Sequence, residues 1–427
     1  MTPLPVADRW KSGQIKNVAA VTLGKMLQPN DSGDDRMASY MRAANVQPDG
    51  VLMLEAKQMW FSANELEVLT LRRGDVVVVE GGVGGYGRAA YLSEDLDEWG
   101  FQNSINRLRP NSDTDGRFVA YYLIALRASG FIERYCNVVS MPHLTAEKLA
   151  AIPVPIPDRS EQSAIADYLD RETARIDTLI DEQRRLIEML RERRACAVDL
   201  ALAEHGLHIP NRFEGYDPDL PEGWRIVLLG RTLKQLTNGF VGPTRDILAD
   251  DGVRYIQGTH IKSGRIDFER RPFYVSRDWH EERPRIHLRA GDVLIVQTGD
   301  VGKVAVVPRD FGEASCHALQ IARTRPEILS GEYLGAFLSS RLGYQSLIAR
   351  ATGALHPHLE AGIRSAPIVV PPLEVQDRIV QVAAQRTAKV DALITETARF
   401  VELSLERRSA LITAAVTGQI DVLAGVV

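Results

Sequence analysis

Several classes of protein are excluded by what this sequence lacks. Its 427 residues include three cysteines, Cys136, Cys196 and Cys316, with no Cys-x-x-Cys spacing among them. A scattered, odd-numbered set argues against a disulfide framework and a cysteine-based zinc site, and it favours a reducing cytoplasm. No apolar run approaches the roughly 18 residues of a membrane span, and the N-terminal MTPLPVADRWK has no apolar signal-peptide core. We therefore expect a cytoplasmic protein without a membrane partner.

The chain also lacks an excess of positive charge. Its net charge is −5, which by itself argues mildly against a nucleic-acid partner. The charge is uneven, however, because residues 151–205 carry a net −4 and residues 254–289 a net +4. With 45% hydrophobic and 25% charged residues, the composition is that of a globular protein, and the length suggests two or three domains.

The sequence contains an internal duplication. The segment that begins IPVPIPDRSEQ at residue 152 matches the segment that begins APIVVPPLEVQ at residue 366, without a gap, at an offset of 214 residues. A weaker similarity precedes each copy: LRRGDVVVV at residues 71–79 corresponds to LRAGDVLIV at residues 288–296, and Arg109-Pro110 corresponds to Arg325-Pro326. Pro-His-Leu also occurs twice, at residues 142–144 and 357–359. The order along the chain is therefore globule, helix, globule, helix.

Each duplicated segment predicts a long helix, because a proline-rich start precedes about 40 residues without Pro or Gly. Steps of four and three residues place a seam on one face, as a two-stranded coiled coil requires. The first seam comprises Ile165, Leu169, Glu172, Ile176, Leu179, Gln183, Leu186 and Leu190. The second comprises Ile379, Ala383, Arg386, Val390, Leu393, Thr397, Phe400 and Ser404, so that Glu172 and Arg386 occupy equivalent slots. Packing of each helix on its own globule is the alternative.

The segments between these helices predict β-rich globules with some helix. Val76–Val79 and Val293–Val296 follow Gly-Asp turns and have the composition of buried strands, whereas residues 118–128 and 333–340 have helical spacing. The sequence thus predicts an α+β fold with pseudo-twofold duplication. It places two β-rich α/β domains at residues 1–150 and 209–365, and two long helices at residues 151–208 and 366–427.

No catalytic or metal site can be identified. Gly82-Val83-Gly84-Gly85-Tyr86-Gly87 is formally G-x-G-x-x-G, but the strand-like RAAYL follows it, so a glycine-rich hairpin is the better interpretation than a dinucleotide site. His356-Pro357-His358 has no third ligand nearby, and proline prevents helical ligand spacing. The absence of an active-site pattern favours a binding or scaffolding role.

An arginine cluster is the strongest candidate for a ligand-binding surface. Residues 254–289 hold nine basic residues, eight of them Arg, interleaved with Phe273, Tyr274, Trp279 and His280. Arginine can bridge phosphates or read guanine edges, and exposed rings can stack on bases. A solvated arginine-rich strand pair explains the composition equally well. The candidate DNA contacts are Arg265, Arg270, Arg271, Arg277 and Lys303, with the scattered Arg42, Lys57, Tyr86 and Arg88 in the first globule.

This arrangement closely resembles the specificity subunit of type I restriction-modification systems. The resemblance rests on LPEGW at residues 220–224, the R-x-GDV turns, the proline-rich lead into each helix, Glu161-Gln162 and Val375-Gln376, and VTGQIDV at residues 416–422. The N-terminal DRWKSGQIK at residues 8–16 departs from the usual Pro-x-x-Trp start.

The resemblance implies a non-catalytic chain with two target recognition domains, each reading one half of a split, asymmetric site on double-stranded DNA. The two helices would form an antiparallel coiled coil that sets the gap between the half-sites. Two methyltransferase subunits would dock on this frame and supply S-adenosylmethionine chemistry at adenine N6, so this chain itself needs no cofactor, and ATP-dependent restriction subunits would join for cleavage. The alternative is a protein-binding scaffold with two interaction globules on a coiled-coil spacer. A fused methyltransferase is disfavoured, because the chain has no Asn/Asp-Pro-Pro-aromatic tetrapeptide of the kind that an amino-methyltransferase shows. Its Pro371-Pro372 pair precedes Leu373 rather than an aromatic residue.

Overall fold

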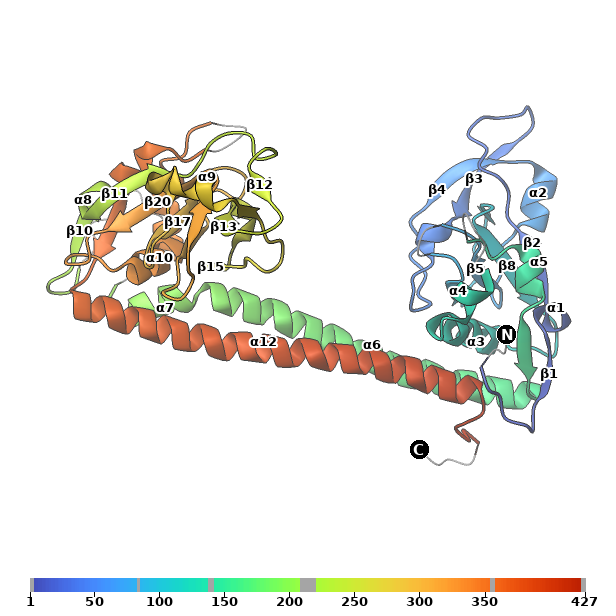
Figure 1. Ribbon diagram of the computed structural model, residues 1–427. Helices are drawn as coiled ribbons and strands as arrows, with labels where there is room; N and C mark the ends of the chain where they lie inside the picture. Colours follow the sequence, from blue (N-terminus) through green and yellow to red (C-terminus); the bar gives the residue numbers. More distant parts are fainter. Residues whose placement is uncertain (1–3, 83–84, 137–141, 208–219, 354–357, 424–427) are drawn as a thin grey trace. The chain divides into compact units, whose positions relative to one another are not determined.

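The computed structural model describes residues 4–82, 85–136, 142–207, 220–353 and 358–423, and the chain divides into two compact units. The first unit combines Met1–Arg184 with Arg399–Val427, and the second is Arg185–Ala398. Each unit contains a segment of both long helices, α6 (Arg159–Ala195) and α12 (Leu373–Val416), together with sheets and shorter helices that we call its globule (Figure 1).

The first globule is built from short strands and helices. Its strands are β1 (Lys11–Gln14), β2 (Ala19–Leu23), β3 (Arg36–Met41), β4 (Lys57–Phe61), β5 (Val76–Val79), β6 (Ala89–Tyr91), β7 (Trp99–Phe101), β8 (Ile105–Pro110) and β9 (Pro153–Ile156). Its α-helices are α1 (Ile15–Val18), α2 (Ala63–Val68), α3 (Gly116–Ala128), α4 (Phe131–Cys136) and α5 (Ala146–Ala150).

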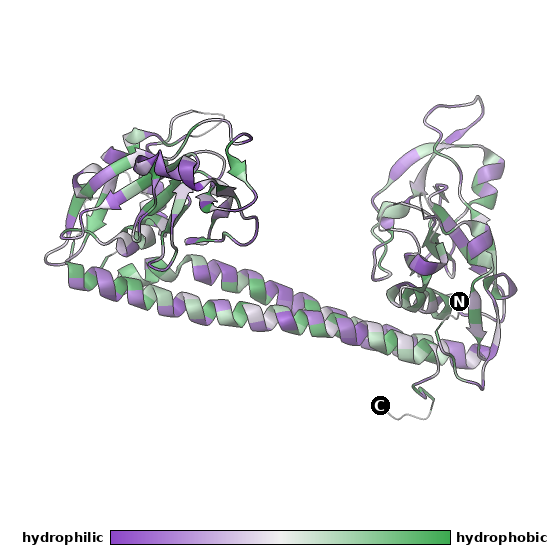
Figure 2. Cartoon of the chain, in the orientation of Figure 1, coloured by the Kyte–Doolittle hydropathy of each residue, from purple (hydrophilic) through white to green (hydrophobic). Residues whose placement is uncertain are grey.

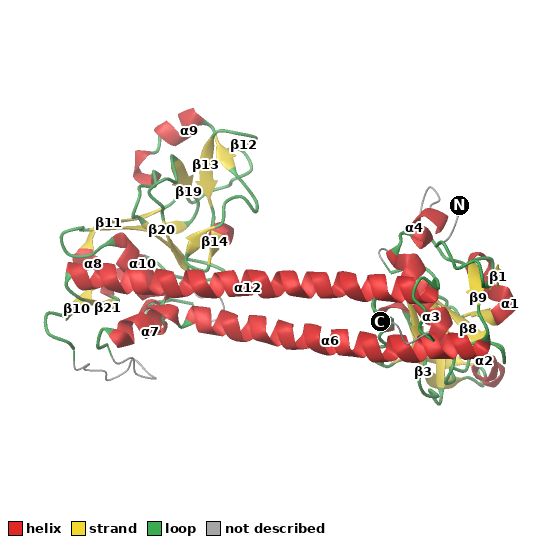
Figure 3. Ribbon diagram, turned by 90° about the horizontal axis from the view of Figure 1, so that it is seen from below, coloured by secondary structure: helices red, strands yellow, loops and turns green. Residues whose placement is uncertain are grey.

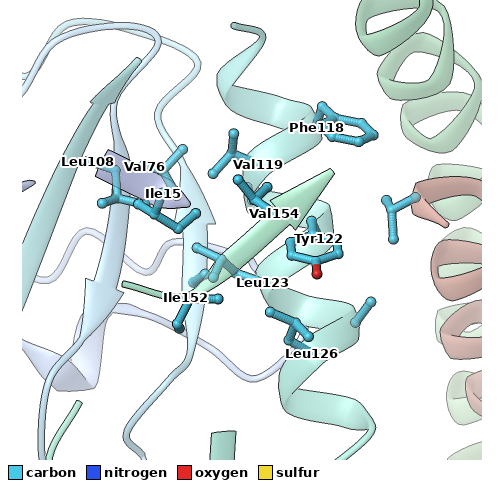
Figure 4. Packing of buried hydrophobic residues seen from close by; sticks show 14 of the residues in the cluster. Ile15, Val76, Leu108, Phe118, Val119, Tyr122, Leu123, Leu126, Ile152 and Val154 are labelled. Carbon is cyan, nitrogen blue, oxygen red and sulfur yellow. The ribbon is translucent and has the colours of Figure 1, made fainter. Parts of the chain in front are cut away.

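An antiparallel sheet of order β2-β8-β5-β6 lies at the centre of the first globule. Alternate residues of β5 point to opposite faces, so Val76 and Val78 join the core formed with α3. Val77 and Val79 join a second core, formed with the sheet of order β4-β3-β7. Figure 4 shows the α3 side of the central sheet, where Val76 and other strand residues lie against the helix. Burial on both faces explains the run of four valines.

The second globule has its own set of short elements. Its strands are β10 (Arg225–Leu228), β11 (Leu233–Asn238), β12 (Leu248–Ala249), β13 (Val253–Ile256), β14 (Ile261–Lys262), β15 (Arg265–Ile266), β16 (Tyr274–Val275), β17 (Val293–Val296), β18 (Val304–Val306), β19 (Ala314–Cys316), β20 (Leu319–Thr324) and β21 (Pro367–Val370). Its α-helices are α7 (Ala197–Glu204), α8 (Leu229–Thr232), α9 (Arg277–Glu281), α10 (Gly331–Ser339) and α11 (Arg341–Ile348).

The second globule repeats the inner frame of the first. Its central sheet has the order β11-β20-β17-β18 and is antiparallel, and β17 again divides its residues between two cores. The strand before each long helix pairs with an early strand of its globule, as β9 with β1 and β21 with β10. The outer sheets differ, with three strands in the first globule and four, of order β12-β16-β13-β19, in the second. The predicted α+β fold and the strands Val76–Val79 and Val293–Val296 are confirmed.

The N-terminal departure from the family pattern is smaller than the sequence suggests. Trp10 directly precedes β1, and Trp224, which is 214 residues later, directly precedes β10. Each tryptophan is 7% exposed and joins the core of its own unit. The residues before the indole have changed, whereas the side chain that anchors the start of the globule is kept.

Polar and apolar residues alternate in bands along α6 and α12 (Figure 2). Within the described parts of the chain, no helix combines the length and apolar character needed to cross a membrane.

Candidate nucleic-acid interface and its helical frame

The Gly-Asp turns are held by a buried ion pair in each globule. Arg109 donates to Asp75 from Nε at 2.8 Å and from Nη2 at 2.7 Å. Arg323 grips Asp292 in the same bidentate way, at 2.8 and 2.7 Å. Both carboxylates are 2% exposed. The R-x-GDV motif is therefore structural, since it fastens the turn before β5 or β17 to the neighbouring strand.

This geometry corrects one step of the sequence comparison. Arg109 corresponds to Arg323, because both lie on the strand next to the Gly-Asp turn and bind its aspartate. The match of Arg109 with Arg325 is wrong. The loops between the turn and this strand differ in length, so the offset of 217 residues at the turn returns to 214 at the strand.

The segment Gly82–Gly87 joins the antiparallel strands β5 and β6, which confirms the predicted hairpin. The corresponding segment of the second globule, Gly299–Lys303, joins the antiparallel strands β17 and β18. Gly82 and Gly302 have φ angles of +109° and +82°, which residues with a side chain rarely adopt. Residues 83–84 lie outside the described part of the chain.

The histidine pair considered as a metal site lies partly outside the described residues, which omit His356 and Pro357. His358 Nε2 is 3.9 Å from Glu360 Oε1. Among the described residues, no group of three or more His, Cys, Asp or Glu side chains could hold a metal ion.

Three candidate cations of the second unit lie beside carboxylates. The pairs are Arg265–Asp391 at 3.9 Å, Arg277–Glu313 at 2.9 Å and Lys303–Asp300 at 2.6 Å. The hydrogen bond from Arg277 lowers the pKa of the Glu313 carboxyl, which favours its ionised form. All three cations are at least half exposed. Exposed pairs contribute little to stability, so a phosphate could replace the carboxylates beside Arg277 and Lys303.

Arg270 and Arg271 lie exposed on the segment between β15 and β16. The Arg271 guanidinium is 5.3 Å from the ring centroid of Phe273. The backbone carbonyl of Arg271 makes a 2.9 Å hydrogen bond with Nε2 of the buried His260. This hydrogen bond anchors the segment to the globule, and the side chains of Arg270 and Arg271 are both exposed.

The interleaved aromatic residues are occupied by protein contacts. The Trp279 ring meets the rings of Phe240 and Tyr255 edge-on, and the Arg283 guanidinium lies 4.5 Å from its centroid. His280 is 4% exposed and stacks on another histidine ring at 3.7 Å. These contacts give Trp279 and His280 a packing role rather than the base-stacking role considered from sequence.

The candidates of the first unit fall in two places. Arg42 follows β3 and forms an ion pair of 2.7 Å with Glu55, and Lys57 is exposed at the start of β4. Arg88 lies in the glycine hairpin and donates to a backbone carbonyl of the turn after Arg42. Tyr86 packs against the core, and burial raises the pKa of its hydroxyl. The structure therefore brings Arg42 and Arg88 to one turn, places Lys57 opposite Tyr40 near that turn, and packs Tyr86 against the core.

Sequence reasoning missed a polar cavity of about 1080 Å³ in the first unit. Its cationic lining residues are Arg72, Arg73, Arg109, Arg117 and Arg159. A hydrogen bond with Asp115 raises the pKa of Arg117. The cavity gave no sequence signal, because its arginines come from separate segments and aspartates balance their charge.

The seam of the long helices differs from the predicted one by one residue in several slots. Ile165, Leu169, Leu190, Ile379, Ala383, Val390, Thr397 and Ser404 are buried, and Ile176, Gln183 and Leu186 are half-buried. Leu179, Leu393 and Phe400 are instead 37%, 48% and 42% exposed, so their assignment to the seam is wrong. The residue after each of them turns inward. Both residues of each pair are apolar, so the sequence pattern did not distinguish them.

Within each unit, the segments of α6 and α12 run antiparallel and side by side (Figures 1 and 3). In the first unit, Arg408 binds Asp177 with Nε–Oδ1 and Nη2–Oδ2 distances of 2.8 and 3.2 Å. In the second, Arg194 binds Asp391 at 2.5 and 3.3 Å. The two pairs are related by the 214-residue offset with the helices exchanged, which gives the pairing its pseudo-twofold character.

Glu172 and Arg386, which have opposite charges in equivalent seam slots, each form an ion pair with another residue. Glu172 pairs with Arg175 on its own helix, and Arg386 pairs with Glu204 of α7. Each of these two residues therefore has its partner within its own unit.

A buried glutamine ties each globule to the start of its long helix. Gln162 Nε2 donates to the carbonyl of the proline five residues earlier at 2.8 Å, and its Oε1 accepts the backbone N–H of Asp115 at 2.9 Å. Gln376 repeats both bonds at 2.8 and 2.9 Å, with Ser330 as the donor. The Glu-Gln and Val-Gln starts therefore fix each helix to the adjacent loop.

Residues 7–189 match the family model of the type I restriction modification DNA specificity domain. The type I restriction enzyme EcoBI specificity subunit of Escherichia coli is 25% identical over 285 residues, which cover 64% of this chain and 58% of that subunit. The alignment thus spans less than two thirds of that relative. The type I restriction enzyme MjaVIII specificity subunit of Methanocaldococcus jannaschii is 21% identical over 309 residues, covering 71% of this chain and 70% of the relative.

Two solved structures have a similar fold. A chain from a structure described as the structural basis of complex assembly and conformational transition of the type I R-M system has a TM-score of 0.69 and 19% identity, covering 98% of this chain and 100% of that chain. The HsdS subunit from Thermoanaerobacter tengcongensis has a TM-score of 0.54 and 18% identity, covering 97% and 98%. These likenesses concern the fold, with its sheets and long helices.

Proposed function

We propose that this chain is a type I restriction-modification specificity subunit and selects the DNA site at which such a complex acts, since residues 7–189 match the specificity-domain family model and the two relatives are specificity subunits. The family is non-catalytic, so we assign methyl transfer and cleavage to partner subunits. S-adenosylmethionine would be bound by the methyltransferase partners and used at adenine N6. We place this activity in the cytoplasm, in keeping with the free cysteines Cys136, Cys196 and Cys316.

The observation that carries this proposal is the repetition of one inner frame beneath two different outer layers. The central sheets have the same strand order, whereas the outer sheet has three strands in the first globule and four in the second. Two related but unlike readers suit a double-stranded site with two different halves. The exposed Arg270 and Arg271 are our candidates for contact with the second half-site.

The long helices provide two equivalent surfaces for partner docking. The first unit carries Leu179 and Leu403, which are 37% and 52% exposed, and the second carries Leu393 and Met189, which are 48% and 58% exposed. The two sets are related by the 214-residue offset. Exposed apolar side chains often mark protein interfaces, so we assign one methyltransferase subunit to each set. ATP-dependent restriction subunits would join this assembly for cleavage.

We further propose that the length of the helix pair sets the gap between the half-sites. The test is a seven-residue insertion after Arg185 in α6, combined with a seven-residue insertion after Arg399 in α12, so that both helices grow by one heptad. At 1.5 Å per residue this adds about 10.5 Å, the length of about three base pairs at ~3.4 Å each. In the complex with its methyltransferase subunits, sequencing of methylated adenines should show a gap longer by about three base pairs.

The half-site sequences should not change, because the globules are untouched. The same seven residues inserted after Leu423, beyond the end of α12, provide the control. An unchanged gap in the double insertion would refute the ruler, and a wild-type complex without any methylated motif would refute the proposed function itself.

A further inference from the structure

We propose that the ion pairs Arg408–Asp177 and Arg194–Asp391 are joints that hold each globule at a fixed position along the helix pair. They would therefore be positioning residues for the gap between the half-sites. This inference rests on the proposed function and adds named residues to it.

The first joint connects three segments of the first unit. Arg408 is 10% exposed, binds both carboxylate oxygens of Asp177, and donates from Nη2 to the backbone carbonyl of Asp49 at 3.2 Å. Asp49 belongs to a tight turn of the globule, and a Cβ on the neighbouring Gly50 would lie 2.7 Å from Ile124 Cδ1. Because this turn is pressed onto α3, the guanidinium links both helices to the body of the globule.

A cavity of about 350 Å³ adjoins this joint. It is lined by the turn at Pro48 and Asp49, by Ile124 of α3, and by Asp177 and Arg408. At the edge of this cavity, the hydrogen bond from Arg408 to the Asp49 carbonyl connects the turn to α12.

The second joint has the same location in the repeat and is completed by a different residue. Asp391 accepts both hydrogen bonds from Arg194, and its Oδ2 lies 3.9 Å from Nη2 of Arg265. Arg265 belongs to the β14–β15 hairpin, which is joined to the central sheet by a bridge between Gly264 and Ala305. The helix residue that contacts the globule is Arg408 in the first unit and Asp391 in the second.

These joints differ from the ion pairs that form within α6 itself. Arg175–Glu172, Arg184–Asp181 and Arg191–Glu188 join residues three positions apart on one helix, and each has a side chain at least 59% exposed. Pairs within a helix cannot set its position against a partner. An apolar seam with a heptad repeat also tolerates a shift by one heptad, whereas a polar pair at one place in the interface specifies the register.

The test is the double variant Asp177→Asn/Asp391→Asn in the full complex with its methyltransferase subunits. The amide keeps the shape of the side chain but removes the charge of the bidentate pair. The substrate is a DNA library that holds both half-sites constant and varies the gap. We expect methylation at gaps about three base pairs shorter or longer, which correspond to a shift by one heptad, to rise about tenfold relative to the preferred gap, the ratio expected for losing a charge-assisted hydrogen bond.

The matched control is Glu188→Gln/Glu402→Gln, which changes exposed carboxylates at repeat-equivalent positions of the same helices. It should leave the gap profile unchanged. The charge-reversed pair Asp177→Arg/Arg408→Asp restores an ion pair between the helices but removes the donor to the Asp49 carbonyl, so its gap profile should lie between those of Asp177→Asn and the wild type. A uniform fall in methylation with an unchanged gap profile would overturn the proposal, because it would show a purely structural role.

A milder variant, Arg265→Gln, keeps the proposal testable if the double variant does not fold. Arg265 is 69% exposed, so its loss should leave folding intact and broaden the gap profile to a smaller extent. If Arg265→Gln instead relaxes one base of a half-site, Arg265 reads DNA and the second joint is refuted. A wild-type complex that methylates no motif would count against the proposed function and not against the joints.

Discussion

Replacing Arg323 by Met should destabilise the second unit by about 3 kcal/mol. The change removes the guanidinium that binds Asp292 at 2.8 and 2.7 Å, and leaves a carboxylate that is 2% exposed. An unpaired buried charge costs about 3–5 kcal/mol. The backbone N–H of Arg289, at 2.8 Å from Asp292 Oδ2, offsets about 1 kcal/mol of this. For a unit the size of Arg185–Ala398, the melting temperature should fall by about 6–12 °C.

The double variant Arg323→Met/Asp292→Asn separates the buried charge from the lost contacts. Asparagine still accepts the bond from Arg289 and leaves no charge buried, so the double variant should recover most of the lost stability. The assay is differential scanning calorimetry, with Arg109→Met as the counterpart in the first unit. Arg109 is 31% exposed against 15% for Arg323, so its removal should cost less. A loss below about 1 kcal/mol, or a double variant no more stable than Arg323→Met, would refute the reasoning.

Three further predictions concern DNA, pH and partners. Arg270→Ala/Arg271→Ala should weaken DNA binding and reduce the slope of log K against log salt by about one for each phosphate contact that is lost. Intact binding at physiological salt would show that these arginines do not contact DNA, and it would favour the scaffold alternative. Burial and the stacked His287 lower the pKa of His280 from its ordinary 6.5, so the unfolded chain takes up the proton first and the second unit should lose stability as pH falls below about 6.5. His280→Gln should make the dependence of melting temperature on pH shallower, and an equal slope in both proteins would contradict this assignment. Leu393→Glu should release one of two methyltransferase subunits, seen as a lower mass by light scattering, while Glu402→Gln keeps both; full occupancy in Leu393→Glu would exclude this docking surface.

The repeated pattern of the chain was readable from sequence because its signals are local. Four consecutive valines at Val76–Val79 mark a strand buried on both faces, and long stretches without Pro or Gly mark the helices. The gapless match that includes Gln162 and Gln376 showed that two copies exist, and the structure adds that both glutamines make the same two bonds.

The surroundings of the candidate DNA contacts could not be predicted from sequence, because the environment of a charged side chain depends on residues far away in the sequence. Arg265, Arg277 and Lys303 look alike as members of a basic cluster, yet each lies next to a carboxylate. The partner of Arg265 is Asp391, which no local pattern could identify. From sequence, Trp279 is likewise a candidate for stacking on a base, but its ring contacts three neighbouring side chains, Phe240, Tyr255 and Arg283.

The duplication and the two long stretches without Pro or Gly thus determined, from sequence alone, the order of globules and helices along the chain. Only the tertiary structure decided which residue of each apolar pair, such as Leu179 and Ile180, enters the seam. It also decided that Arg408 meets Asp177 and Arg194 meets Asp391. The physical reason is that composition and periodicity act within one element, whereas the register between two helices depends on side chains more than 190 residues apart.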